Sequence, residues 1–205
     1  MPVETLFATE VYRARVRDRG IGKLNADLLR ECRQLRIDDA AGRRWSRTHY
    51  PGGYTSYGSV NRLHRVSPTF ARLSDLITPH VKAFVATLRF DVARRPLEMT
   101  DCWVNLMPRG VAHAWHLHPL STISGTYYVQ TPPGCAGIKF EDPRLDRMMA
   151  APPRRVRAPR SARVWVSFPA QAGHLVLFES WLRHAVPPNP VRAERVSVSF
   201  NYGWF

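Results

Sequence analysis

Residues 195–204, RVSVSFNYGW, contain the alternation that decides the fold of this chain. Polar and apolar side chains follow one another with a period of two, which is typical of a β-strand with two different faces. One face carries Arg195, Ser197, Ser199 and Asn201, and the other carries Val196, Val198, Phe200 and Tyr202. A polar face is solvated in an open sheet, whereas in a small barrel it lines a ligand cavity.

Five similar runs precede this strand, beginning near residue 97. They are EMTDCWVNLM (98–107), SGTYYVQ (124–130), AGIKFE (136–141), RVWVSF (163–168) and HLVLFE (174–179). Glycine and proline separate the runs, and short strands at such spacing indicate an antiparallel sandwich or barrel. We therefore expect a mainly β core.

The preceding half predicts a strand followed by helices. Residues 6–16 alternate like a strand, and we expect Asn25 to cap a helix. Ser67 followed by Pro68 is a favourable helix start, because proline suits the first helical position. An apolar stripe at helical spacing continues from there. The predicted architecture is thus a β core with flanking helices.

A length of 205 residues, 44% of them hydrophobic, suits one domain with a substantial core. We expect a single domain over residues 1–205. Residues 1–96 would supply the N-terminal strand and outer helices, and residues 97–205 the β core. An arginine- and proline-rich insertion at 143–163 interrupts that core.

The charge of the chain is strongly positive, with 30 basic and 16 acidic residues and a net charge of +14. Such a balance is compatible with a polyanionic partner. The basic residues are scattered, however, except in the insertion 143–163, which holds seven arginines and four prolines. We interpret the insertion as either a solvated loop or a lid that helps to bind an anionic substrate. A nucleic-acid partner is the less favoured interpretation.

Several classes of protein are disfavoured by the sequence. The three cysteines, Cys32, Cys102 and Cys135, are far apart and predict neither a disulfide framework nor a CxxC pair. No apolar run approaches the length of a membrane span, so no membrane partner is expected. The N-terminus lacks the layout of a signal peptide, and we expect a cytoplasmic protein.

The segment AHAWHLHP, residues 112–119, concentrates three of the eight histidines. His116 and His118 are two residues apart, so in a strand both imidazoles face the same side. His184, at a predicted strand start, is the candidate third ligand for iron, zinc, copper or nickel. His113 is an odd number of residues from His116 and His118, so in a strand it faces the other side. It is expected to support the site or lie on the surface.

Arg195 and Ser197, on the polar face of the last strand, are suited to binding a carboxylate. A guanidinium donates to both carboxylate oxygens, and a hydroxyl two residues away adds another donor. The sequence therefore predicts an anion site on the same barrel as the histidines.

The order of these residues resembles that of the Fe(II)/2-oxoglutarate-dependent oxygenases, especially a branch of short bacterial and phage proteins. The resemblance spans roughly residues 46–203. Its motifs here are Gly52-Gly53-Tyr54-Thr55-Ser56, Trp103-Val104-Asn105, His116-Leu117-His118-Pro119, Ser124-Gly125-Thr126-Tyr127-Tyr128, Asp142-Pro143-Arg144, Ser180-Trp181-Leu182-Arg183-His184-Ala185-Val186 and Arg195-Val196-Ser197-Val198-Ser199-Phe200-Asn201.

The resemblance implies a double-stranded β-helix (jelly-roll) barrel that binds Fe(II) and uses 2-oxoglutarate as cosubstrate. Its reaction converts 2-oxoglutarate and O₂ into succinate and CO₂ while a substrate C–H bond is oxidised, as in a hydroxylase of a small molecule or protein. His116, His118 and His184 would hold the metal, with no catalytic residue beyond these ligands. The implied cosubstrate-binding residues are Arg195, Ser197, Tyr128 and Asn105.

One position departs from the broader superfamily, whose metal ligands are two histidines and one carboxylate. His118 stands where that superfamily has Asp or Glu, and Glu141 and Asp142 are the alternative ligands. A cupin-like metal barrel without 2-oxoglutarate chemistry is an alternative function. It would require a glutamate near positions 122–123, which are Thr and Ile. A basic nucleic-acid-binding protein would leave the histidines unexplained.

Overall fold

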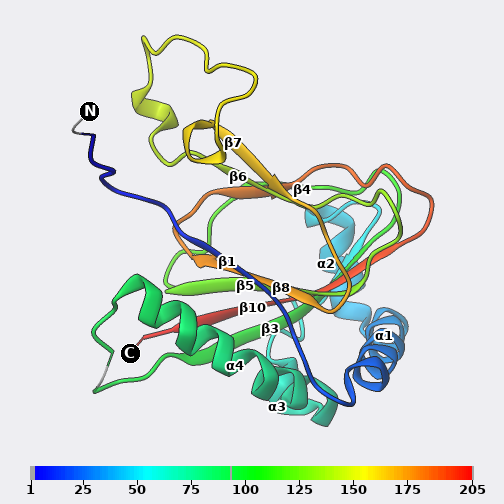
Figure 1. Ribbon diagram of the computed structural model, residues 1–205. Helices are drawn as coiled ribbons and strands as arrows, with labels where there is room; N and C mark the ends of the chain where they lie inside the picture. The colour runs from blue at the N-terminus through cyan, green and yellow to red at the C-terminus, as the bar shows by residue number, and fades with distance from the viewer. Residues whose placement is uncertain (1–2, 93, 205) are drawn as a thin grey trace.

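The computed structural model describes residues 3–92 and 94–204, which form two antiparallel sheets facing one another (Figure 1). The larger sheet has the strand order β1-β8-β5-β10-β3-β2, and the smaller has the order β4-β9-β6-β7. The strands are β1 (Val11–Arg15), β2 (Tyr54–Thr55), β3 (Glu98–Met107), β4 (His113–His116), β5 (Ile123–Gln130), β6 (Ile138–Glu141), β7 (Trp165–Phe168), β8 (His174–Glu179), β9 (His184–Val186) and β10 (Arg195–Gly203).

The chain winds between the two sheets from β3 onward. Strands β3, β5, β8 and β10 lie in the larger sheet, while β4, β6, β7 and β9 lie in the smaller one. Eight strands that alternate in this way form a double-stranded β-helix, or jelly roll. The prediction of a mainly β fold with flanking helices is therefore confirmed.

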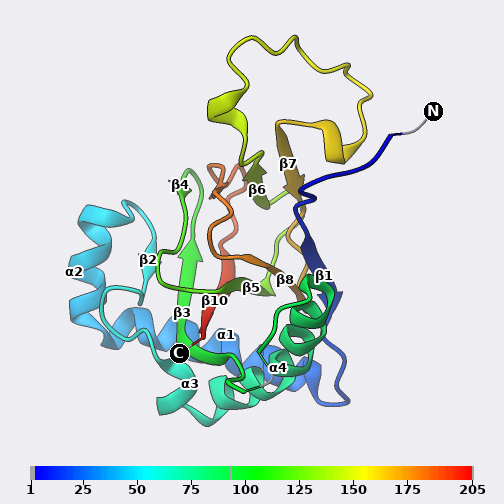
Figure 2. The same ribbon diagram turned by 90° about the vertical axis from the view of Figure 1, so that its left-hand side faces the viewer.

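In the described part of the chain, the helices that precede the jelly roll are α1 (Ile21–Asp38), α2 (Ala40–His49), α3 (Leu63–Val66) and α4 (Pro68–Leu88). Helices α1, α3 and α4 lie against the outer face of the larger sheet (Figures 1 and 2). Helix α4 begins where its sequence predicts, because the Ser67 hydroxyl accepts a hydrogen bond from the Phe70 amide at 3.4 Å.

Two expectations for the first half are wrong in their boundaries. Helix α1 begins at Ile21, four residues before the expected cap at Asn25. The Asn25 side chain instead accepts a hydrogen bond from the Tyr127 hydroxyl at 2.6 Å, which ties the helix to the sheet. The first strand is shorter than residues 6–16 and covers only Val11–Arg15, because pairing with β8 begins at Val11.

The larger sheet has an apolar core on each face. Its outer side packs on the helices through residues such as Leu28, Phe70 and Tyr127. Its inner side, between the two sheets, includes Tyr128 and Phe178. Neighbouring residues of β5 thus serve opposite cores, as the alternation of a strand requires.

Gly125 on β5 shows how closely the side chains of neighbouring strands pack in the larger sheet. An added Cβ there would lie 2.5 Å from the Phe200 ring and 2.7 Å from Leu177. We expect Gly125→Ala to lower the free energy of unfolding by about 1–3 kcal/mol, the usual cost of overpacking. Gly22, in α1, has no atom within 4 Å of such a Cβ. Gly22→Ala is therefore expected to stabilise by about 0.5–1 kcal/mol. Urea denaturation of both variants checks this, and equal effects would contradict it.

The insertion 143–163 leaves the smaller sheet after β6 and returns at β7 as a long excursion (Figure 2). Within it the regular structure consists of two single turns, Leu145–Arg147 and Arg160–Ala162. Among the described residues, none of the helices combines the length and apolar character that a bilayer span requires.

Candidate metal centre

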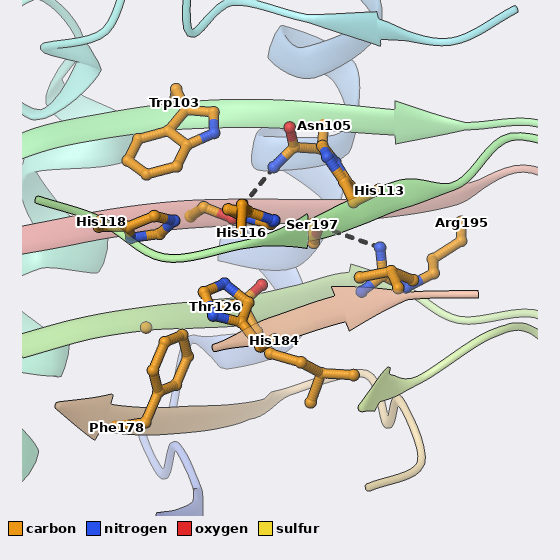
Figure 3. A pocket seen from close by; sticks show the side chains of 14 residues that line it. Trp103, Asn105, His113, His116, His118, Thr126, Phe178, His184, Arg195 and Ser197 are labelled. Atoms are coloured by element: carbon orange, nitrogen blue, oxygen red, sulfur yellow. Dashed lines mark hydrogen bonds between the residues drawn. The ribbon is translucent and has the colours of Figure 1, made fainter. Parts of the chain in front are cut away.

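Three histidines converge between the sheets. One ring nitrogen from each of His116, His118 and His184 lies within 4.8 Å of the others (Figure 3). His116 ends β4 and pairs directly with His184, the first residue of β9. His118 lies just beyond β4, where its amide donates to the Ser180 carbonyl at 3.0 Å. The structure thus brings together all three predicted metal ligands.

The local geometry of the histidine segment differs from the expected continuous strand. Strand β4 ends at His116, and its register with β9 shifts between His113 and His116. Such a bulge changes which side chains face inward. As a result, His113 lines the same cavity as the metal ligands despite its sequence parity. Its ring stacks on Tyr50 at a centroid distance of 4.3 Å.

Backbone carbonyls orient two of the converging imidazoles. His116 Nδ1 lies 2.7 Å from the Ala114 carbonyl oxygen, and His184 Nδ1 lies 2.9 Å from that of Leu182. A carbonyl only accepts, so each Nδ1 carries the proton and Nε2 keeps its lone pair. This arrangement presents Nε2 of both rings as metal ligands.

A polar side-chain network orients His118 in the same manner. Its Nδ1 lies 2.9 Å from Asn201 Oδ1 and 2.7 Å from Ser124 Oγ. Ser124 in turn contacts Asn201 at 2.8 Å and Ser180 at 2.7 Å. Asn201, Ser124 and Ser180 were not predicted from the sequence as residues of the site. The alternation of β10 was the available signal, since it places Asn201 on the same face as Arg195.

Asn201 offers a test of this support. The Asn201→Ala substitution removes the side-chain oxygen that accepts a hydrogen bond from His118 Nδ1. We expect metal affinity to fall by roughly 10–100-fold, the usual effect of losing an outer partner of a ligating histidine. Titration with Ni(II) or Fe(II) measures the change. His174→Ala, on a partly exposed histidine outside the cluster, is the matched control. Unchanged affinity in Asn201→Ala would contradict the assigned role.

Burial keeps the three imidazoles neutral. It lowers the pKa of His184 to about 2 and that of His118 to about 4, with neighbouring histidines adding to both shifts. Burial also lowers the pKa of His116. Metal coordination requires neutral imidazole, so these ligands need no deprotonation near neutral pH.

The acidic alternatives to His118 are engaged elsewhere. Glu141 forms an ion pair with Arg183 at 2.6 Å, and Asp142 forms one with Arg144 at 2.8 Å. In residues 3–92 and 94–204, the cluster able to hold a metal consists of histidines alone. The structure therefore favours His118 over a carboxylate as the third ligand.

Arg195 lies in the cavity that the histidines line, and it is only 2% exposed. Its Nη1 contacts the Ser197 hydroxyl at 3.4 Å and the Met107 sulfur at 3.8 Å, and its guanidinium lies 5.0 Å from the Tyr128 ring centroid. Within the described residues, Arg195 Nε has no hydrogen-bond partner. No carboxylate in the described parts of the chain pairs with Arg195. Burying a guanidinium that has no ion-pair partner costs folding free energy unless an anion binds it.

The other predicted cosubstrate residues surround Arg195 in different ways. Ser197 and Asn105 line the cavity. Asn105 donates to Ser199 at 3.0 Å, while its Oδ1 is buried without a partner. Tyr128 packs between the sheets, and its buried hydroxyl is also unpartnered. Asn105 Oδ1 therefore gives the cavity spare capacity for a hydrogen bond, while the Tyr128 ring packs against the Arg195 guanidinium.

Comparison with known proteins agrees with this geometry. A family model described as "Putative 2OG-Fe(II) oxygenase" matches residues 101–201, which contain all of the predicted site residues. None of the curated proteins matches the sequence.

Solved structures share the fold at low sequence identity. A prolyl-4-hydroxylase from Pseudomonas putida has a TM-score of 0.62 and 17% identity, covering 95% of this chain and 92% of that one. The α-ketoglutarate-dependent epimerase SnoN has a TM-score of 0.63 and 18% identity, covering 95% of this chain and 78% of that one. HygX from Streptomyces hygroscopicus, solved with nickel, 2-oxoglutarate and hygromycin B bound, has a TM-score of 0.60 and 16% identity. The match covers 95% of this chain and 83% of that one. Through residues 101–201, the chain belongs to the 2OG-Fe(II) oxygenase family.

Proposed function

We propose that this protein is a hydroxylase that uses Fe(II) and 2-oxoglutarate. The observation that carries the proposal is the shared cavity of Arg195 and the three histidines. Metal ligands and a buried, unpaired guanidinium in one cavity fit a metal ion together with an anionic cosubstrate.

The donor set suits a first-row divalent metal. His116, His118 and His184 would bind it through Nε2, because their Nδ1 atoms already contact acceptors. Three protein ligands leave positions open for other molecules. With neutral imidazoles only, the site keeps the full charge of the metal, which favours an anionic cosubstrate. When bound, iron supplies the activation of O₂ that amino-acid side chains lack.

Arg195 and Ser197 would hold the distal carboxylate of 2-oxoglutarate. The guanidinium offers paired donors, and burial strengthens their hydrogen bonds to an anion. Tyr128 and Asn105 have buried polar atoms free to bind the same ligand. These residues would fix the orientation of the cosubstrate relative to the histidines.

Apolar side chains form the remaining walls near the histidines. The Phe178 ring packs edge-on against the His184 ring, with 4.5 Å between the ring centroids. The Trp103 ring meets the His118 ring in the same way, at a centroid distance of 5.9 Å. These rings exclude water from the metal-binding side of the cavity, which limits unproductive side reactions. A prolyl-4-hydroxylase is among the solved structures that share this fold, and the proposed hydroxylation is of the same kind of reaction.

Titration of 2-oxoglutarate into the Fe(II)-loaded protein under anaerobic conditions tests the proposal. We expect saturable binding at about one molecule per chain, since one Arg195 site faces one metal site. The cupin-like alternative predicts that the protein binds metal without binding 2-oxoglutarate. That outcome would overturn the proposal.

A further inference from the structure

The outer face of the smaller sheet presents tryptophans and cations instead of the usual short polar side chains. Trp115 on β4, Lys139 on β6 and Trp165 on β7 share this face with Arg183, which precedes β9. We call these four residues the tryptophan face. It lies on the side of the sheet away from the metal centre, so the proposed reaction does not explain it.

Lys139 stands between the two tryptophans. Its ammonium lies 5.8 Å from the Trp115 ring centroid and 5.1 Å from that of Trp165. The cross-strand neighbours of Lys139 are Ala185 and Ser167. Both are small, so Lys139 is the longest side chain in this row of the sheet.

Much of the aromatic surface stays accessible. Trp165 is 50% exposed although Lys139 lies over its ring. The tryptophan face therefore has stacking surface available next to fixed positive charge.

The charge around this face is positive. Its neighbouring acid, Glu141, is neutralised by Arg183 at 2.6 Å. The insertion 143–163 rises from the adjacent strand ends with seven arginines and a single acid, Asp146. Asp146 forms an ion pair with Arg147 at 3.0 Å, and Arg160 donates to the Ser167 carbonyl at 2.6 Å, which ties the insertion to the edge of the sheet.

We propose that the tryptophan face, with the arginines of the insertion, binds single-stranded nucleic acid. Unpaired bases stack on aromatic rings, while lysine and arginine neutralise the backbone phosphates. A duplex hides its base faces and would use only the charges. A lipid surface or a sulfated polysaccharide would likewise gain nothing from base stacking. The combination of accessible indole and cation thus favours the single strand.

Binding of a fluorescent oligothymidylate of about 16 nucleotides to the full chain tests this proposal. We expect Trp165→Ala to weaken binding by about tenfold while leaving the salt dependence unchanged, because it removes stacking and no charge. Lys139→Gln should reduce the slope of log affinity against log salt by about 0.7, the value for one phosphate contact on a single strand. The assay needs no metal, so it is independent of the proposed oxygenase function.

Matched controls lie on the opposite side of the molecule. Trp204 is 55% exposed beyond the end of β10, and Lys82 is exposed on α4. Trp204→Ala and Lys82→Gln are expected to bind like wild type. The proposal is overturned if Trp165→Ala binds like Trp204→Ala. It is equally overturned if heparin or a duplex of matched charge binds as tightly as the single strand, or if only anionic vesicles bind.

Discussion

Replacing His184 with alanine is expected to abolish stoichiometric metal binding. The wild-type chain should bind about one Fe(II), or Ni(II) in its place, through three neutral imidazoles. His184 pairs directly with His116 and is 4% exposed, so its replacement removes one of the three imidazoles that converge in the buried cluster. The two remaining histidines are expected to bind the metal too weakly to retain it, because one of the three ligands is missing.

Metal content of the purified variant, measured after loading and dialysis, checks this prediction. Circular dichroism establishes that the variant is folded, and His116→Ala provides a second, less buried test of the same cluster. His174→Ala, which removes a histidine outside the cluster, should keep full occupancy. Full occupancy in both His116→Ala and His184→Ala would refute the assigned metal centre.

The Arg195→Ala variant is expected to lose most of its affinity for 2-oxoglutarate. Truncating one partner of a buried, hydrogen-bonded charge pair costs about 2–5 kcal/mol, which corresponds to a loss of roughly 30- to 5,000-fold. Arg195 is suited to this role because its guanidinium is buried and Nε lacks a protein partner. Metal binding should persist, since Arg195 is not among the ligands.

Anaerobic titration of 2-oxoglutarate into the metal-loaded variant measures this effect. Arg195→Lys keeps the charge but loses the paired donors, so we expect an affinity between those of wild type and Arg195→Ala. The same site would bind succinate through a carboxylate, so the affinity for succinate should fall in parallel with the affinity for 2-oxoglutarate. If 2-oxoglutarate binds Arg195→Ala as tightly as wild type, its carboxylate site lies elsewhere.

The fold was predictable where its strands are long and alternate clearly. Strands β3 and β8 match the expected residues, 98–107 and 174–179, without change. The bounds of the short strands β2 and β4 were not predicted, because two to four residues carry too little periodicity. Their extended conformation depends on pairing with β3 and β9, which a linear sequence does not display.

The candidate site was predictable to the extent that residue type and spacing define it. The three histidines and Arg195 carry their chemistry in the sequence, and the structure places them in one cavity. Of the two expectations for His113, the structure fits a place beside the site and not on the surface, because the bulge in β4 breaks the parity rule. The partners of His118 were missed because Ser124 and Ser180 come from distant segments that only the fold brings together.

Formation of succinate from 2-oxoglutarate by the Fe(II)-loaded protein in air tests the central claim most directly. We predict metal-dependent succinate release by wild type, increased by pools that contain a substrate, and none by His184→Ala or Arg195→Ala. Wild-type protein that binds both Fe(II) and 2-oxoglutarate but releases no succinate with any pool would contradict the oxygenase assignment. Succinate release by either variant at the wild-type rate would contradict the site.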